Sequence, residues 1–306
     1  MSYIFGPINS RRFGLSLGID LSPKTKSCNF DCLYCELKRS TPTDKISNPP
    51  RVSEIILELK KALDRFKDIE VITITSNGEP TLYPYLEELI SKINLLKNRK
   101  KTLILSNSSL IYKKDIQKIL KKIDIVKLSL DCATNRCFRQ LDRPLKEISL
   151  KKIIDGMVEF SKNYNGSLVI EIMVVKGIND KEEEFEKIDE ILQKIKPARV
   201  DISTVDRPPA YKVKPVSFEK LFELSKNIKN LPVTIARRDK EEALNKELSK
   251  EEIINTLKHR PFTKDDIKTL LSPNSINIFN QLLKDGVIIK KDLSGVIFYD
   301  VNSNQY

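Results

Sequence analysis

The feature that most constrains the fold is a regular alternation of short apolar runs with amphipathic segments. Runs rich in β-branched residues alternate with segments whose apolar residues recur at helical spacing. The runs are residues 13–21, 69–78, 101–109, 124–131, 167–177 and 199–205, and the helical segments are 52–66, 85–97, 114–123, 150–164 and 182–195. About six such units predict a parallel sheet with right-handed crossovers. We therefore expect an α/β fold, a partial (β/α)6 barrel, because a full barrel needs eight units.

The loops that follow the expected strands should hold the chemistry. In parallel α/β sheets, working residues gather at the C-terminal ends of the strands. Here those ends carry polar or glycine-bearing turns, which are SNGEP, SNSS, DCATN, KGIND and DRPPAY. We expect these turns to converge over one end of the barrel.

Three of the five cysteines, Cys28, Cys32 and Cys35, fall within the stretch SCNFDCLYCEL. An odd number of cysteines, three of them bunched, argues against a disulfide framework and favours metal or redox chemistry in a reducing compartment. A closed zinc site needs four ligands, usually as two pairs, and the only histidine, His259, lies far away in the tail. Three thiolates around an iron–sulfur cluster with one open iron fit the spacing better.

The C-terminal part of the sequence breaks the barrel rhythm. Residues 236–247 are predicted to form a charged linker between a barrel (1–235) and a small domain (248–306). That domain shows three short helices and then two strands around an LSG turn, with Thr263 expected to cap the second helix. This is the order of a winged helix, which binds DNA or RNA or mediates protein contacts. We expect His259 to be a surface residue with no catalytic part.

The charge balance suggests a partner without establishing one. The net charge of +12 favours polyanions such as nucleic acid. Lysines that keep the outer faces of helices solvated, as in residues 113–124, are an equally good explanation. There is no apolar run of about 18 residues that could span a bilayer, and no signal-peptide core at the N-terminus. We therefore expect a cytoplasmic protein without a membrane partner.

Several of these motifs together resemble a known family. CNFDCLYC, with Tyr34 before the third cysteine, resembles the signature of the radical S-adenosylmethionine (SAM) superfamily, and NGEPTLYP resembles its glycine-rich loop after the second strand. The resemblance covers most of residues 1–235. The lead-in FGPINSRRFGLSLGIDL and the later SLD, GIND and RPPA are similar to the branch that includes the wyosine tRNA-base synthases. Those enzymes carry a further cysteine set upstream, whereas no cysteine precedes Cys28 here.

The resemblance implies a cofactor and a reaction. Cys28, Cys32 and Cys35 would hold a [4Fe-4S] cluster, whose fourth iron binds the amino and carboxylate groups of SAM. An electron from a donor such as flavodoxin or ferredoxin would break a carbon–sulfur bond, giving methionine and a 5′-deoxyadenosyl radical that abstracts hydrogen from the substrate. The expected substrate is tRNA or another RNA. The alternatives are a radical enzyme acting on a protein or small molecule, and an iron–sulfur redox sensor that binds DNA.

The same resemblance implies SAM contacts near the cysteines. Tyr34 would lie against the adenine, or pack the cysteine loop into the barrel. The backbone carbonyls of Gly78, Glu79 and Pro80 would bind the methionine ammonium group, or simply form a strand-to-helix turn. Asn77 stands where the family usually has its first glycine, and asparagine tolerates positive φ better than most residues.

The remaining candidates follow later strands. Ser129 and Asp131 are placed to bind a ribose hydroxyl, and Asn107 is a further candidate for this contact. The alternative for Asp131 is to cap the next helix. Arginine grips carboxylates and phosphates, so Arg11, Arg12 and Arg207 are candidates for an anionic substrate or the SAM carboxylate, or are ordinary surface residues. Cys132 and Cys137 are expected to be buried apolar residues, because two ligands are too few for a second cluster. No catalytic residue is assigned.

Overall fold

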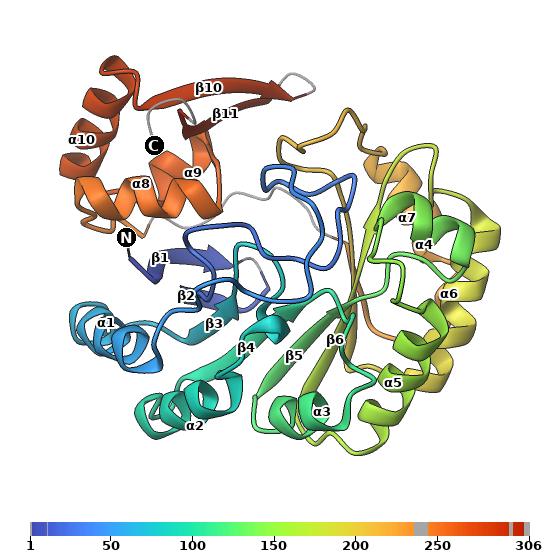
Figure 1. The fold of residues 1–306 in the computed structure, drawn as a ribbon. Helices are drawn as coiled ribbons and strands as arrows, with labels where there is room; N and C mark the ends of the chain where they lie inside the picture. Colours follow the sequence, from blue (N-terminus) through green and yellow to red (C-terminus); the bar gives the residue numbers. More distant parts are fainter. Residues whose placement is uncertain (1, 11, 236–243, 294–295, 303–306) are drawn as a thin grey trace.

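The computed structural model describes residues 2–10, 12–235, 244–293 and 296–302. Arg11 and residues 236–243 of the predicted linker lie outside this described part. The dominant element is a curved eight-stranded sheet in the order β1 to β8 (Figure 1). β1 runs antiparallel to β2, and all pairs from β2 to β8 are parallel. The strands are β1 (Ile4–Ser10), β2 (Gly14–Asp20), β3 (Val71–Thr75), β4 (Lys101–Ser106), β5 (Ile125–Ser129), β6 (Ser167–Val174), β7 (Arg199–Thr204) and β8 (Val233–Ile235).

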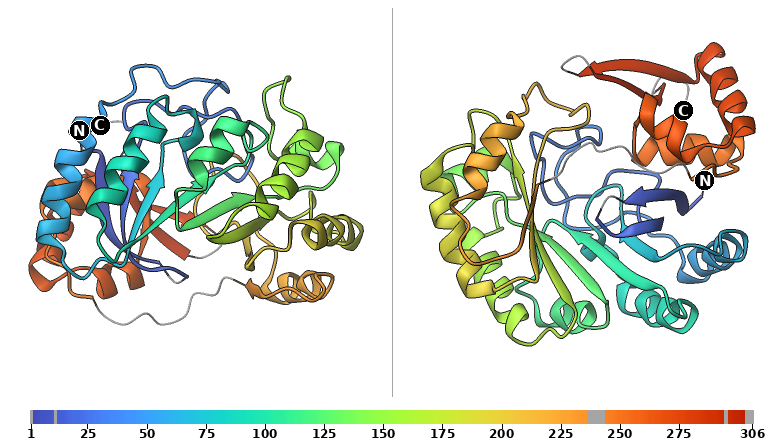
Figure 2. Two further views of the ribbon diagram at one scale, coloured as in Figure 1. Left: turned by 90° about the horizontal axis from the view of Figure 1, so that it is seen from below. Right: turned by 180° about the vertical axis from the view of Figure 1, so that it is seen from behind.

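Helices cover the outer side of this sheet, as the view from behind shows (Figure 2). Each turns an apolar stripe inward; α1, for example, buries Val52, Ile55 and Leu59, which recur at helical spacing. None of the described helices is long and apolar enough to cross a bilayer. The helices of the barrel are α1 (Val52–Arg65), α2 (Leu86–Leu96), α3 (Lys114–Leu120), α4 (Asn135–Leu141), α5 (Leu150–Lys162), α6 (Glu182–Ile195) and α7 (Phe218–Ser225).

The predicted α/β class and the mostly parallel sheet are confirmed. The six expected strands are β2 to β7, and the five expected helices are α1, α2, α3, α5 and α6. β1, β8, α4 and α7 are present but were not predicted from the sequence. β1 contains Pro7, which looks like a strand breaker but is tolerated because β1 is an edge strand.

The C-terminal part, which we call the C-terminal unit (residues 248–302), packs against β1 (Figure 1). Its three helices and final hairpin occur in the predicted order, and Thr263 caps α9 in a capping box. Buried apolar side chains of α8 belong to the same core cluster as those of the barrel. Its elements are α8 (Lys250–His259), β9 (Phe262–Thr263), α9 (Lys264–Leu270), α10 (Pro273–Lys284), β10 (Ile288–Leu293) and β11 (Val296–Val301).

A charged network crosses the interior of the barrel and joins the β1–β2 hairpin to β5, β6 and β7. Arg12, in the β1–β2 hairpin, donates to Glu171 of β6 (3.1 Å) and to Asp201 of β7 (2.8 Å). Lys127 bonds to Glu171 (2.5 Å), and Arg199 bonds to Asp201 (2.7 Å). Burial would raise the pKa of Asp201, but Arg12 and Lys127 outweigh it and hold that pKa below its ordinary value. Arg12 is therefore a structural tie between distant strands, and the alternative of an ordinary surface residue is wrong, whereas its binding of an anion stays a prediction.

This network yields a stability prediction. Asp201→Asn should lower the free energy of unfolding by about 3 kcal/mol, because Arg199 would lose its carboxylate partner and Arg12 and Lys127 would be left with Glu171 alone. Glu88→Gln, which breaks an exposed ion pair on α2, is the control and should change it by less than about 0.5 kcal/mol. Urea unfolding followed by circular dichroism measures both. Equal, small effects would contradict the role of the network.

Candidate active site

The three clustered cysteines lie on a long loop, residues 21–51, between β2 and α1 (Figure 1, blue). Other loops at the C-terminal ends of the strands hold it in place. The Leu33 amide donates to the Leu141 carbonyl at the end of α4 (2.9 Å), and the Ala210 amide after β7 donates to the Cys35 carbonyl (2.8 Å). The expected convergence of loops at one end of the barrel is therefore present.

Two further contacts join Ser27, next to the first cysteine, to the loop after β3. The Ser27 amide donates to the Asn77 carbonyl (2.8 Å), and the Glu79 amide donates to the Ser27 carbonyl (2.9 Å). Gly78 lies between them at φ +137°, and a Cβ there would sit 1.8 Å from the Ser27 carbonyl oxygen. Only glycine allows the two loops to approach this closely.

Asn77 has a different role from the one expected. Asn77 does not adopt a positive φ, so the tolerance of asparagine for that conformation plays no part here. Its amide donates to Oδ1 of Asp20 at the end of β2 (2.7 Å). The positive φ of this loop falls on Gly78 instead.

Two of the three thiols receive hydrogen bonds from nitrogen. Asn107, just after β4, donates to Cys28 Sγ (3.5 Å), and Lys26 donates to Cys35 Sγ (3.4 Å). The three cysteines are free and half-buried. The side-chain amide of Asn107 lies against the first cysteine, and its expected contact with a ribose stays a prediction.

The third thiol, that of Cys32, donates to Oδ1 of Asp142 (3.6 Å). Burial raises the pKa of Cys32, and the Asp142 carboxylate raises it further. Burial also raises the pKa of Cys28 to about 12 and that of Cys35 to above its ordinary value. Binding of a metal centre by these residues would therefore have to release protons from the thiols.

Glu79 anchors the loop after β3 through its side chain, a role that the sequence analysis missed. Its buried carboxylate accepts hydrogen bonds from the Thr81 backbone amide (3.0 Å), the Ser106 hydroxyl (2.8 Å) and the Asn107 backbone amide (2.7 Å). Burial raises the pKa of Glu79, and these hydrogen bonds oppose that shift. The carboxylate fixes the turn at Pro80–Leu82, a short 3₁₀ helix, to the end of β4.

Tyr34 and Asp131 form a buried pair. The Tyr34 hydroxyl donates to Asp131 Oδ2 (2.5 Å), and the Met173 amide donates to Oδ1 (2.7 Å). Burial raises the pKa of Asp131 to about 6. Thr134 caps α4, so the alternative that Asp131 caps this helix is wrong. The two carboxylate oxygens of Asp131 therefore connect the side chain of Tyr34 to the backbone of β6.

A cavity of about 500 Å³ opens inside the barrel beside these loops. The sequence-predicted residues that line it include Arg12, Tyr34, Cys35, Gly78, Glu79, Asn107 and Ser129. Asp131 instead lines a neighbouring cavity of about 20 Å³. Arg207 also lines the larger cavity and pairs with Glu36 (3.4 Å).

The C-terminal unit also reaches this cavity, through His259 and Arg260. The His259 side chain is only 12% exposed, and its Nε2 lies 2.6 Å from Oδ2 of Asp20. The expectation of a surface histidine is wrong because α8 packs directly on β1. No local signal marks His259, whereas Asp20 ends a strand and the strand-end argument could have found it.

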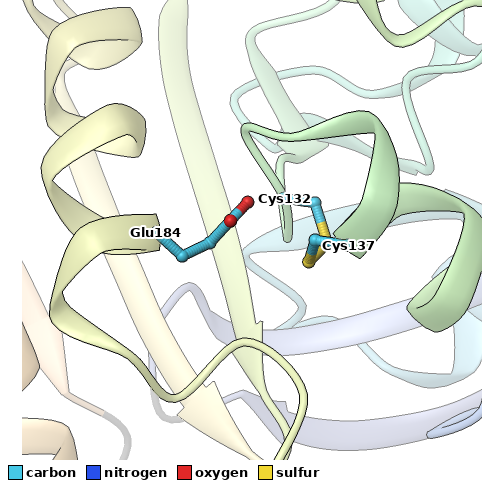
Figure 3. A group of neighbouring side chains, drawn as sticks. All are labelled: Cys132, Cys137 and Glu184. Carbon is cyan, nitrogen blue, oxygen red and sulfur yellow. A yellow bond between two sulfur atoms is a disulfide. The ribbon is translucent and has the colours of Figure 1, made fainter.

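Cys132 and Cys137 are joined by a disulfide (Figure 3). The turn before α4 brings their Cα atoms to 5.6 Å, within the usual range for such a bond. Glu184 of α6 lies near the two sulfurs, but its carboxylate accepts hydrogen bonds from the amides of Ala133 (2.7 Å) and Thr134 (2.9 Å). Both residues are buried as predicted, but the expectation of unpaired thiols is wrong. Because both thiols form the disulfide, Cys132, Cys137 and Glu184 do not offer a free set of metal ligands.

Comparisons with known proteins agree with this geometry. A family model described as Radical SAM superfamily matches residues 22–190. A Helicobacter pylori protein named UPF0026 protein is 39% identical, covering 97% of this chain and 96% of its own length. A dual-specificity RNA methyltransferase of Buchnera aphidicola is 27% identical, covering 57% of this chain and 50% of its own.

A solved structure of Streptococcus suis SuiB bound to S-adenosylmethionine has a similar fold, with a TM-score of 0.56 at 20% identity. The similarity covers 72% of this chain and 50% of SuiB. In such enzymes the cofactor supplies the chemistry, while the protein binds and orients the reactants. This chain belongs to the radical SAM superfamily and is an enzyme that uses a [4Fe-4S] cluster and S-adenosylmethionine.

Proposed function

We propose that this protein cleaves SAM reductively at a [4Fe-4S] cluster held by Cys28, Cys32 and Cys35, and that it modifies tRNA. One observation carries the assignment of the site. A single loop carries three free thiols, and one of them, Cys35, lines a 500 Å³ cavity whose wall includes Gly78 and Glu79. A redox sensor would need no such cavity for a cosubstrate, so the enzyme is favoured over the regulator.

The residues present suit an iron–sulfur cluster. Thiolates are the ligands that such clusters prefer, and the N–H donors of Asn107 and Lys26 would stabilise negative charge on sulfur. When bound, the cluster supplies the electron that breaks a carbon–sulfur bond of SAM, giving methionine and a 5′-deoxyadenosyl radical. Three cysteines leave one iron for SAM. Flavodoxin or ferredoxin is the proposed class of electron donor.

The protein's own residues would bind and orient SAM beside these thiols. The carbonyls of Glu79 and Pro80 already accept hydrogen bonds from the Leu82 and Tyr83 amides. The Gly78 carbonyl is therefore the strongest candidate for the methionine ammonium group. The Glu79 carboxylate acts indirectly, by fixing this loop to β4.

Ser129 and Tyr34 are the proposed contacts for the nucleoside part of SAM. Both line the large cavity. Asp131 is better suited to hold Tyr34 in place than to bind ribose itself, because both its oxygens already accept hydrogen bonds. The aromatic ring would stack on the adenine.

Three observations support RNA as the substrate. The net charge of +12 favours a polyanion. The C-terminal unit has the helix and strand order of a winged helix, and its α8 ends at the cavity. An RNA methyltransferase is among the related sequences. A protein or small-molecule substrate would require neither the positive charge nor a winged helix.

The proposal is tested by the production of 5′-deoxyadenosine. The cluster is reconstituted anaerobically and reduced with dithionite, SAM is added with or without bulk tRNA, and the products are separated by chromatography. We expect 5′-deoxyadenosine, in amounts that rise with tRNA. Its absence from protein with an intact cluster would contradict the SAM chemistry, and insensitivity to tRNA would contradict the substrate.

Alanine substitution tests the cluster ligands. Cys28→Ala, Cys32→Ala and Cys35→Ala should each lose nearly all cluster iron and sulfide, because each removes one of three ligands. Cys137→Ala is the matched control and should retain both, because its sulfur is bonded to Cys132. Iron and sulfide analysis after reconstitution measures this. Iron loss in the control would refute the assignment of ligands.

Charge reversal tests the C-terminal unit as the RNA-binding element. Lys284, at the exposed end of α10, belongs to the helix that a winged helix would place against nucleic acid. Lys284→Glu should weaken tRNA binding and reduce the slope of log K against log salt by about one. Lys187→Glu, at an exposed position of α6, is the control. Filter binding at several salt concentrations would show equal behaviour of both variants if another surface binds the RNA.

A further inference from the structure

The side chain of His259 extends from the end of α8 into the barrel. Its Nδ1 lies 2.8 Å from the Asn255 carbonyl oxygen, and its Nε2 lies 2.6 Å from Asp20 Oδ2. A carbonyl oxygen only accepts hydrogen bonds, so Nδ1 donates to Asn255. Nε2 and the Asp20 carboxylate share the second bond. Both ring nitrogens are therefore committed.

The ring is also clamped by packing. It stacks on Phe5 of β1, with ring centroids 4.1 Å apart and an interplanar angle of 2°. Phe5 in turn lies flat against β2, where a Cβ on Gly18 would be 2.1 Å from the phenyl ring. β2, Phe5 and His259 thus form three successive layers that fix the imidazole.

Asp20 transmits this position to the proposed SAM loop. Its Oδ1 accepts hydrogen bonds from the Asn77 amide (2.7 Å) and the Ser22 amide (2.8 Å). Asn77 in turn receives the Ser27 amide on its carbonyl. One carboxylate, oriented by His259, therefore fixes the start of both the cysteine loop and the loop that contains Gly78.

Attachment of the C-terminal unit to the barrel does not depend on this histidine. The Asn255 side chain donates to the Ile4 carbonyl (2.7 Å), and the Gly6 amide donates to the Thr256 hydroxyl (3.2 Å). Buried apolar residues of α8 add to these bonds. The hydrogen bond from His259 to Asp20, at the end of β2, instead helps to position the loops that follow β2 and β3.

We propose that His259 is a positioning residue of the SAM site, through which the C-terminal unit completes the cradle for the cosubstrate. The inference rests on the proposed function, because it requires that the loop containing Gly78 binds SAM. The C-terminal unit is then more than an RNA-docking module. The enzyme cannot form its full SAM affinity without it.

The test measures SAM binding to the full-length, cluster-loaded protein by equilibrium dialysis, without turnover. The variants are His259→Ala and His259→Gln, whose amide can still donate to Asp20. Asn255→Ala is the matched control, because it removes one hydrogen bond between the same helix and β1 without affecting Asp20. Cluster iron and melting temperature are measured for each variant.

We expect His259→Ala to raise the Kd for SAM about tenfold or more, as loss of a residue that orients ligand-binding groups commonly does. His259→Gln should restore most of the affinity, and Asn255→Ala should leave it unchanged. Iron content should be equal throughout. If His259 only stabilised the fold, Asn255→Ala would lower the melting temperature as well, and His259→Gln would not restore the affinity for SAM.

Two results would overturn the proposal in distinguishable ways. If wild-type protein binds SAM and His259→Ala binds it equally well, or if Asn255→Ala weakens binding as much, His259 is only part of the interface. If wild-type protein with an intact cluster binds no SAM at all, the proposed function fails, and this inference fails with it.

Discussion

The candidate site depends on the backbone pairing of Ser27 with the loop around Gly78. Two hydrogen bonds join these segments, and the missing side chain of Gly78 allows the contact. This pairing sets the first cysteine beside the strand ends, where Asn107 and Glu79 then fix its surroundings. A larger residue at position 78 would push the cysteine loop away from the loop after β3 and from the cavity that Cys35 lines.

The interior of the barrel and its rim do different work. In the interior, Arg12 and its carboxylate partners tie the first hairpin to β6 and β7. At the C-terminal ends of the strands, loops meet over a cavity large enough for a cosubstrate, and this cavity also reaches Arg12, Lys127 and Glu171 of the network. β1 links both parts to the C-terminal unit, because it continues into the hairpin and also receives α8. The ion-pair network ties the strands together, and several loops and the C-terminal unit surround the cavity. This arrangement is consistent with an enzyme that must shield a radical from water.

Features recorded in local sequence were predictable, and features created by tertiary contact were not. The period of the apolar residues gave β2 to β7 and their helices, and the spacing of Cys28, Cys32 and Cys35 indicated an open iron–sulfur site. The burial of His259 and the ion pairs of Arg12 arise from segments far apart in the chain. The disulfide between Cys132 and Cys137 depends on the turn that precedes α4, which periodicity did not predict.

The most direct test of the central claim is electron paramagnetic resonance of the reduced, reconstituted protein before and after SAM is added. If one iron is open beside the Gly78 loop, the reduced protein should show a [4Fe-4S] signal whose g-values change when SAM binds. A cluster signal that SAM leaves unchanged would contradict the account, because it would mean that the three-cysteine loop does not present an open iron to the cosubstrate.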